Sequence, residues 1–162
     1  MKKLIVFMLC LLILTGCSAT ETFEQIGDVY APAVQTDPRE IQLQLPVDAS
    51  SGVFSGGTGR LYFCEGYEIV VETLAGGNLN QTIRNSTGYD MDRITVIEVP
   101  QSDDFKRYEC VWVTTGEEGE VVGRSVIIDD GAYHYCVCVS ALSANAGSLQ
   151  NTWTELLRSV SV

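Results

Sequence analysis

The feature that most constrains the fold is a set of three β-rich runs in the C-terminal half, residues 106–115, 120–128 and 132–140. They are joined by Gly116-Glu117-Glu118-Gly119 and by Asp129-Asp130-Gly131, both strong turn signals. Because tight turns connect neighbouring antiparallel strands, the pattern predicts an antiparallel meander. Both alternating faces of these strands are apolar, so we expect both faces of the sheet to be covered. One face would carry Val111, Val113, Val122, Val126, Ile128, Tyr135, Val137 and Val139, and the other Tyr108, Cys110, Trp112, Val121, Ile127, Cys136 and Cys138.

The preceding part of the chain also favours β-structure. Apolar residues alternate with polar ones over 41–45, which predicts a half-buried strand that Pro46 ends. Residues 61–64 and 67–73 are separated only by Glu65-Gly66, a spacing that predicts a tight hairpin because glycine takes a positive φ without strain. The glycine-rich stretch before this hairpin, residues 52–59, is predicted as a loop.

Two helices and one further strand complete the prediction. Leu79 and Ile83 are four residues apart and predict a short helix over 78–85. A strand over 94–99 follows, ended by Pro100. Near the C-terminus, steps of four, three and four residues place an apolar stripe on one helix face, which would cover the sheet. The stripe consists of Leu149, Trp153, Leu156 and Val160. The fold class is therefore α+β, with an antiparallel sheet of about six to seven strands covered by helices.

The N-terminus carries an export signal. Lys2 and Lys3 precede an apolar run, residues 4–14, which is shorter than the ~20 residues that span a bilayer. Leu14, Thr15, Gly16 and Cys17 follow in an arrangement that resembles the lipobox of a bacterial lipoprotein precursor. This resemblance implies that residues 1–16 are a signal peptide and are removed. It also implies that Cys17 receives acyl chains such as palmitate, two or more of which hold a protein stably at a membrane. Residues 17–39 read as a tether and residues 40–162 as one domain.

The order of the predicted elements resembles the PsbP-like α/β sandwich. The likeness covers paired early strands, a short helix, a strand, a meander with Asp130-Gly131 in its last turn, and a closing helix around Trp153 and Ser159. The stretch 127–135 is typical of small uncharacterised lipoproteins of this shape from anaerobic Gram-positive bacteria. These motifs are turn and core residues, so the resemblance implies a fold and no catalytic residues.

The chain is strongly acidic, with a formal net charge of −11, and removal of Lys2 and Lys3 makes it more so. This charge opposes binding to nucleic acid, so we expect no nucleic-acid partner. Expected partners are the membrane, through the lipid anchor, and an envelope protein. Acidic pairs such as Glu117-Glu118 fall at predicted turns and do not match the calcium-loop pattern, so we interpret them as solvated turn residues.

Four cysteines belong to the domain: Cys64, Cys110, Cys136 and Cys138. An even count in an exported chain suggests disulfides, whereas the alternative is a set of small buried thiols. Cys136 and Cys138 are two residues apart on one strand face, which is too far for an easy mutual bond. With simple register in both turns, Ser125 lies opposite both Cys110 and Cys136, separating these two cysteines by about 9–10 Å. Cys64 with Cys136 or Cys138 is the better disulfide candidate.

His134 is the only histidine of the chain. It shares a strand face with Cys136 and Cys138, and together with Cys64 or Cys110 these residues form a ligand set that suits zinc or copper. The alternative is a structural strand residue. HExxH and paired CxxC motifs are absent from the sequence, and any catalytic triad would have to use this one histidine. We therefore assign no catalytic residue, and no cofactor is indicated.

Two functional hypotheses follow. The first is a membrane-anchored, extracytoplasmic lipoprotein that acts as a non-enzymatic binding or accessory module. The second is a thiol-redox or metal-binding protein that uses His134, Cys136 and Cys138 with Cys64 or Cys110.

Overall fold

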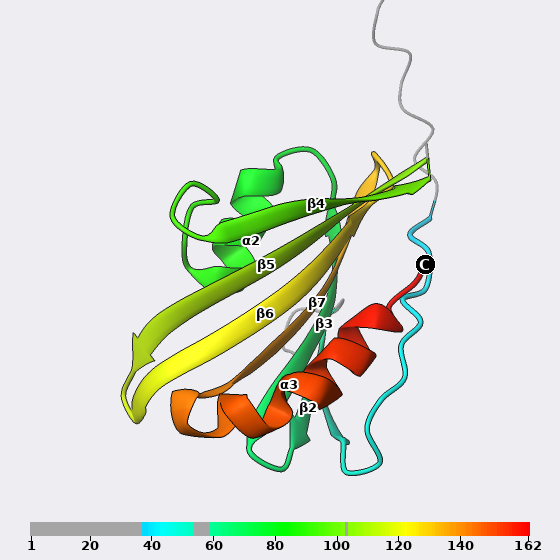
Figure 1. The fold of residues 1–162 in the computed structure, drawn as a ribbon. Coiled ribbons are helices and arrows are strands. Elements are labelled where there is room, and N and C mark those ends of the chain that lie inside the picture. The colour runs from blue at the N-terminus through cyan, green and yellow to red at the C-terminus, as the bar shows by residue number, and fades with distance from the viewer. Residues whose placement is uncertain (1–36, 54–58, 103) are drawn as a thin grey trace, which may run out of the picture. The chain divides into compact units, whose positions relative to one another are not determined.

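The computed structural model describes residues 37–53, 59–102 and 104–162. These residues form one seven-stranded sheet and two helices (Figure 1). The strands are β1 (Ser50–Val53), β2 (Arg60–Cys64), β3 (Tyr67–Ala75), β4 (Thr95–Ser102), β5 (Phe105–Gly116), β6 (Gly119–Asp129) and β7 (Tyr133–Leu142). The helices are α2 (Leu79–Thr87) and α3 (Ser143–Arg158).

The sheet is antiparallel throughout, in the order β1-β2-β3-β7-β6-β5-β4. The meander predicted for the C-terminal half is confirmed as β5, β6 and β7. The predicted early hairpin is confirmed as β2 and β3, whose Cys64 and Tyr67 pair across a turn in which Gly66 has φ +79°. Because β3 pairs with β7, the two halves of the chain form one continuous sheet.

Each face of the sheet carries a hydrophobic core, as the two apolar faces of the strands predicted. α3 crosses in front of the sheet in Figure 1, and α2 lies behind it. The larger core, under α3, includes the fully buried Trp153, Tyr135 and Val137. The smaller core, under α2, is built around Ile83 and Ile127. The sheet is therefore the middle layer of three.

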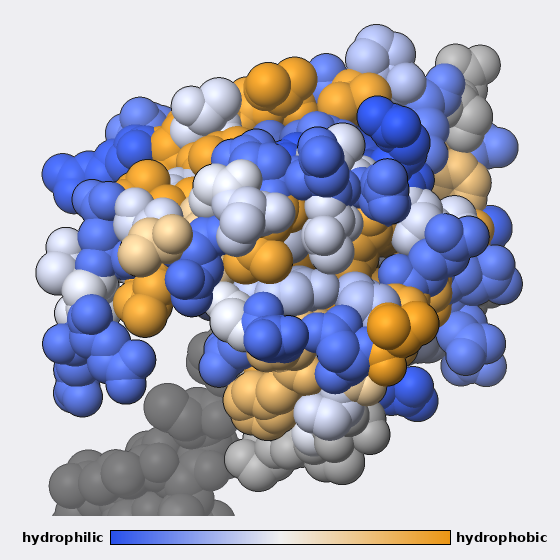
Figure 2. All heavy atoms as spheres, turned by 60° about the horizontal axis from the view of Figure 1, so that its bottom comes forward, coloured by the Kyte–Doolittle hydropathy of each residue, from blue (hydrophilic) through white to orange (hydrophobic). Residues whose placement is uncertain are grey.

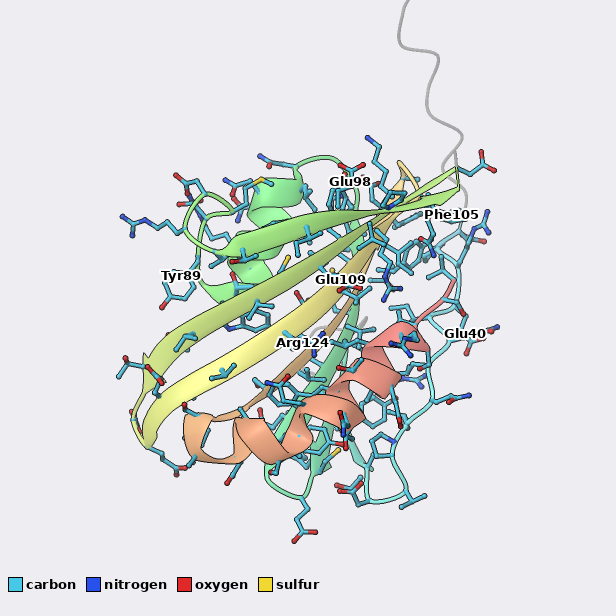
Figure 3. The ribbon with its side chains drawn as sticks, viewed as in Figure 1. Glu40, Tyr89, Glu98, Phe105, Glu109 and Arg124 are labelled. Carbon is cyan, nitrogen blue, oxygen red and sulfur yellow. The ribbon has the colours of Figure 1, made fainter. Side chains whose placement is uncertain are left out.

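α3 does not cover the part of β5 that carries Val111 and Val113. Val111 and Val113 on β5 lie on the same face of the sheet as α3, as predicted, but their side chains remain 43% and 49% exposed. Beside them, Arg124 on β6 reaches α3, where its Nη1 donates to Thr154 Oγ1 at 3.1 Å (Figure 3). Arg107 on β5 is buried, and its guanidinium donates to the carbonyls of Leu157, in the last turn of α3, and of Val160, just beyond it.

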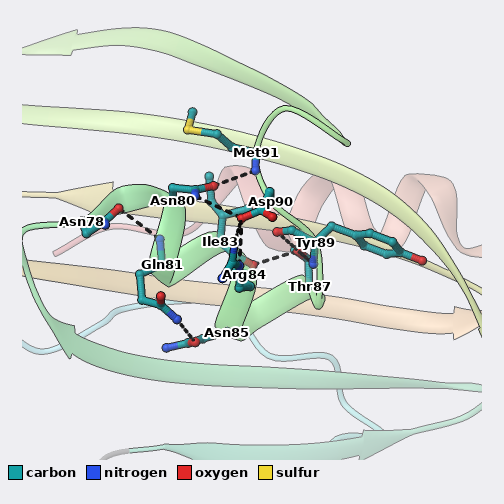
Figure 4. A network of polar contacts seen from close by, with 10 residues as sticks. All are labelled: Asn78, Asn80, Gln81, Ile83, Arg84, Asn85, Thr87, Tyr89, Asp90 and Met91. Atoms are coloured by element: carbon teal, nitrogen blue, oxygen red, sulfur yellow. Dashed lines mark hydrogen bonds and ion pairs between the residues drawn. The ribbon is translucent and has the colours of Figure 1, made fainter.

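α2 is fixed at both ends by side-chain and backbone caps. The Asn78 side chain accepts from the Gln81 N–H at 3.2 Å, and Gly88, with φ +80°, donates to the Arg84 carbonyl at 2.8 Å. The loop that follows returns to the helix through Asp90, which accepts hydrogen bonds from Asn80 and Arg84 (Figure 4). These contacts fix both ends of the short helix and tie it to the loop that follows.

The strand predicted over residues 41–45 is wrong. Its backbone makes only one β-bridge, between Gln42 and Ser161. Ile41 and Leu43 are half-buried and pack against the core under α3, whereas Leu45 is exposed, so the alternation of burial holds only over residues 41–44. The partner is a single residue past the end of α3 rather than a sheet strand, which leaves no ladder to extend.

Two strand boundaries also differ from the prediction. Pro100 does not end β4, which continues to Ser102. β4 is the last strand of the sheet, and proline is tolerated on such an edge because its missing N–H faces no partner. The register also shifts between Val99 and Ser102. At the other edge, Gly52 lies in β1 rather than in a loop.

The lipobox, Cys17 and the tether up to residue 36 lie outside the described residues, so these predictions stay predictions. The described chain begins beside the core: the Arg39 N–H donates to the Tyr135 hydroxyl at 3.0 Å, and the Arg39 guanidinium lies 4.8 Å from the centre of the Phe105 ring. Neither α2 nor α3 has the length and apolar character of a membrane span.

Candidate functional site

Three of the four domain cysteines lie on the α2 face of the sheet. Cys110 on β5 and Cys138 on β7 both lie opposite Ser125 on β6, and Cys136 lies opposite Ile127. The prediction that Ser125 lies opposite Cys136 is therefore wrong, because the register on β7 is shifted by two residues. These residues form a thiol cluster, the name used below for Cys110, Cys136 and Cys138.

The turn between β6 and β7 explains this shift. Asp129 pairs with His134, so four residues lie between the paired positions. The Asp130 carboxylate organises them by accepting the N–H groups of Ala132 and Tyr133, at 2.9 and 2.7 Å, and the Tyr135 hydroxyl at 2.8 Å. Burial alone would raise the pKa of Asp130, but these hydrogen bonds hold it below its ordinary value. Asp130 is thus a structural residue of a wider turn.

The thiol cluster is closed to solvent. Cys110, Cys136 and Cys138 are 1%, 2% and 6% exposed, and Ile83 of α2 packs on the first two. Burial raises the pKa of all three thiols, that of Cys138 to about 12. Because the thiolate is the nucleophile and the metal ligand, thiols with raised pKa are unreactive near neutral pH.

Cys64 does not join the cluster. It pairs with Tyr67 at the end of β2 and packs against the core under α3, on the opposite face of the sheet. The predicted disulfide of Cys64 with Cys136 or Cys138 is therefore wrong, because the sheet separates the two sides. Cys64, Cys110, Cys136 and Cys138 are all free thiols in the structure.

His134 is buried, with 1% exposure, and links α2 to the sheet. Its Nδ1 shares a hydrogen bond of 2.7 Å with the Thr82 hydroxyl of α2, and its Nε2 lies 3.7 Å from an Asp129 carboxylate oxygen. Among the residues the structure describes, no three His, Cys, Asp or Glu side chains gather closely enough to hold a metal ion. The geometry therefore favours the structural interpretation of His134, and the thiol-redox or metal hypothesis loses its ligand set.

An open cavity lies at the opposite end of the sheet from the β6–β7 turn. It has a volume of about 440 Å³ and is bordered by the β2–β3 turn, the β5–β6 turn and the end of β7. We call it the hairpin-end cavity. Its apolar wall includes Phe63, Val121 and Leu142, and Phe63 is 48% exposed. This volume lies within the usual range of ligand pockets.

The charged lining of the hairpin-end cavity is acidic. Glu68 at the start of β3 and Glu117 and Glu118 from the β5–β6 turn line it, and none of its lining residues is basic. Figure 2 brings this end of the molecule forward, with hydrophilic residues of the β5–β6 turn standing apart from the body at the left. The sequence pattern places Glu117 and Glu118 only in a turn. It gave no sign that the β2–β3 hairpin lies near them, because sheet order alone decides that.

No protein-family model matches the chain, and no curated protein matches it in sequence. Solved structures of bacterial proteins do resemble it. A crystal structure from Bacteroides thetaiotaomicron has a TM-score of 0.51 and 10% sequence identity, covering 75% of this chain and 44% of that one. LpqN, described as involved in cell envelope biogenesis of Mycobacterium tuberculosis, has a TM-score of 0.48 and 10% identity, covering 75% of this chain and 82% of that one.

The likeness to the Bacteroides structure shows a shared fold alone, because identity is 10% and this chain spans less than half of that protein's length. The α+β class predicted from the sequence agrees with the antiparallel sheet and the two helices of the described residues. The chain is thus an α+β domain similar in fold to a bacterial protein of known structure.

Proposed function

We propose that this protein is a membrane-anchored, extracytoplasmic lipoprotein that acts as a non-enzymatic binding or accessory module of the cell envelope. The anchor rests on the lipobox-like sequence Leu14-Thr15-Gly16-Cys17 behind a short apolar run. The binding role rests on the open cavity of the folded domain.

One observation carries the binding role: the thiol cluster and His134 lie apart from the open cavity. The thiol cluster and His134 are buried under α2, with exposures of 6% or less. The hairpin-end cavity is lined by carboxylates and apolar groups, together with Cys64, Tyr67, Ser140 and Asn145. Catalysis by a nucleophile and a base requires both groups within reach of a substrate. The chain's one histidine does not border the cavity, and burial raises the pKa of the Cys64 thiol that does, so this thiol is a poor nucleophile near neutral pH.

We also propose that the domain belongs to the PsbP-like α/β sandwiches. The order of its elements supports this: a hairpin (β2 and β3), a short helix (α2), a strand (β4), a three-strand meander and a closing amphipathic helix (α3).

The anchor is tested by intact-mass measurement of the protein purified from membranes of its own host. The expected mass is that of a chain beginning at Cys17 plus its acyl groups, found in the membrane fraction. A Cys17→Ser variant is the control and is expected to keep residues 1–16. A wild-type chain with a free Cys17 thiol and an intact leader would refute the anchor.

The binding role is tested by photo-crosslinking in the native membrane from a probe amino acid placed at Glu118, with a probe at Glu98 as the matched control. A discrete partner band from position 118 that is weak from position 98 supports it. Turnover in a broad hydrolase and thiol-oxidoreductase screen, retained in a variant in which Cys64, Cys110, Cys136 and Cys138 are alanine, would point to an enzyme instead.

A further inference from the structure

We propose that the hairpin-end cavity receives an arginine side chain presented by a partner protein, an inference that rests on the binding role proposed above. It follows from three properties of the cavity: its charge, its aromatic wall and its position on the rim of the molecule.

The charge of the cavity selects a cation. Glu68 comes from β3, whereas Glu117 and Glu118 come from the β5–β6 turn, so carboxylates flank the cavity from two separate hairpins. None of its lining residues is basic, so the carboxylates have no neutralising group within the cavity wall. A second copy of this chain is a poor occupant, because a net charge of −11 makes two copies repel.

The aromatic wall selects a guanidinium group on an apolar stem. Phe63 leaves 48% of its surface exposed, so a partner's side chain can reach the ring. A guanidinium stacks on such a ring and binds a carboxylate through two parallel hydrogen bonds. Val121 and Leu142 offer apolar surface to the three-carbon stem. Arginine therefore fits this lining better than an ammonium group does.

The position of the cavity favours a side chain over a free small molecule. Glu68, Glu117 and Glu118 are all exposed residues at or beside turns, so the rim is open to solvent. Sites for small molecules usually bury most of the ligand, whereas an anchor side chain needs a pocket only for its tip. The other contacts of such a partner would be made by the surface around the rim.

The first test measures binding of a peptide to the full chain in detergent micelles by amide chemical shifts. The probe is acetyl-Gly-Arg-Gly-amide, and the control is the same peptide with citrulline, which keeps the shape of arginine without its charge. We expect weak binding, in the millimolar range, with shifts centred on Gly66, Glu68 and Glu117. We also expect the affinity to fall as salt is added, because the rim charges are exposed.

The second test uses variants. Glu117→Gln with Glu118→Gln is expected to weaken binding of the arginine peptide about tenfold, and Phe63→Ala about fivefold. The matched control is Glu98→Gln, whose side chain lies on β4 at the other end of the sheet (Figure 3) and whose affinity should not change. Phe63 is half exposed and the two glutamates are turn residues, so these variants are expected to fold.

Any of four results would overturn the proposal: no shifts at about 10 mM peptide, equal binding of the citrulline peptide, shifts away from the cavity, or unchanged affinity in the double variant. Free arginine amide that binds more tightly than the peptide would replace the protein partner with a small cation. The crosslinking test of the binding role does not depend on arginine. A partner band from position 118 combined with silent peptide titrations would therefore refute this inference and leave the proposed function standing.

Discussion

The thiol cluster and the hairpin-end cavity are opposites. The cluster is built from the residue types that sequence analysis singles out for chemistry, and it is covered by α2 to an exposure of 6% or less. The cavity is open and is lined mainly by glutamates, Phe63, and aliphatic and polar residues, with Cys64 as the one cysteine among them. The comparison teaches that residue type reveals potential chemistry, whereas access decides whether the chemistry is available.

The largest expected effect on stability comes from truncating Ile83, the α2 side chain that packs over the thiol cluster. Ile83 is fully buried between α2 and the sheet, so Ile83→Ala is expected to lower the free energy of unfolding by about 2–5 kcal/mol. Urea denaturation measures this loss, and alkylation of Cys110 and Cys136 should accelerate in parallel. Val113→Ala is the control: Val113 is 49% exposed, and its change should stay within about 0.5 kcal/mol.

A smaller effect is expected where Trp112 lies against Gly123 on the covered face. A Cβ at position 123 would clash with Trp112 Cζ2, so Gly123→Ala forces the ring to move at a cost of about 2–3 kcal/mol. Gly116 lines the open cavity, and a Cβ there meets nothing nearer than 3.6 Å, so Gly116→Ala is the matched control. Equal melting temperatures for the two variants would contradict the close packing of Trp112.

The bond between α2 and His134 is expected to contribute less. Thr82→Val keeps the shape of the side chain but removes the hydroxyl that bonds His134 Nδ1 at 2.7 Å, at a cost of about 1–2 kcal/mol. Amide hydrogen exchange should then accelerate in α2 before it does so in α3. Thr154→Val, which loses a contact to Arg124 near the surface, should leave both helices nearly unchanged.

The closed state of the cluster also predicts how stability depends on pH. Burial raises the folded-state pKa of Cys138 from 9.0 to about 12, so the folded protein disfavours the thiolate more than the unfolded chain does. Its contribution to stability is therefore fully present below pH 9 and is lost as the pH rises from 9 towards 12. The urea midpoint should be lower at pH 10 than at pH 8. In the Cys138→Ala variant this difference should be smaller. A fall of the same size in that variant would assign the effect to other groups, such as the tyrosines.

The smallest effect is expected at Tyr67, whose ring packs 6.3 Å from Trp153. Its hydroxyl is buried without a hydrogen-bond partner among the described residues, and its polar neighbours include the Cys64 thiol, a weak acceptor. Tyr67→Phe should therefore be neutral or stabilise the fold by up to about 1 kcal/mol. Tyr135→Phe is the matched variant and should destabilise, because the Tyr135 hydroxyl bonds both Asp130 and the Arg39 N–H. Thermal melts of the two variants compare them directly.

Much of this protein followed from the sequence alone. Gly66 between two β-rich runs specified a hairpin, the stripe through Trp153 specified the covering helix, and strands apolar on both sides specified covers on both faces. These inferences succeed because turn geometry, helical period and strand alternation are local properties, each set by residues within a few positions of one another. The lipobox-like sequence is also a local pattern of four consecutive residues, and the mass measurement described above tests it.

Only the tertiary structure decided which residues meet. The sequence allows a disulfide between Cys64 and Cys138, but the structure places these two residues on opposite faces of the sheet. Cys138 rather than Cys136 lies opposite Ser125, because hydrogen bonds to Asp130 widen one turn. Glu68 and Glu118 share a cavity because β3 pairs with β7, a contact between distant parts of the chain. Register, sheet order and burial arise from the packing of the whole domain, and for that reason no local pattern in the sequence encodes them.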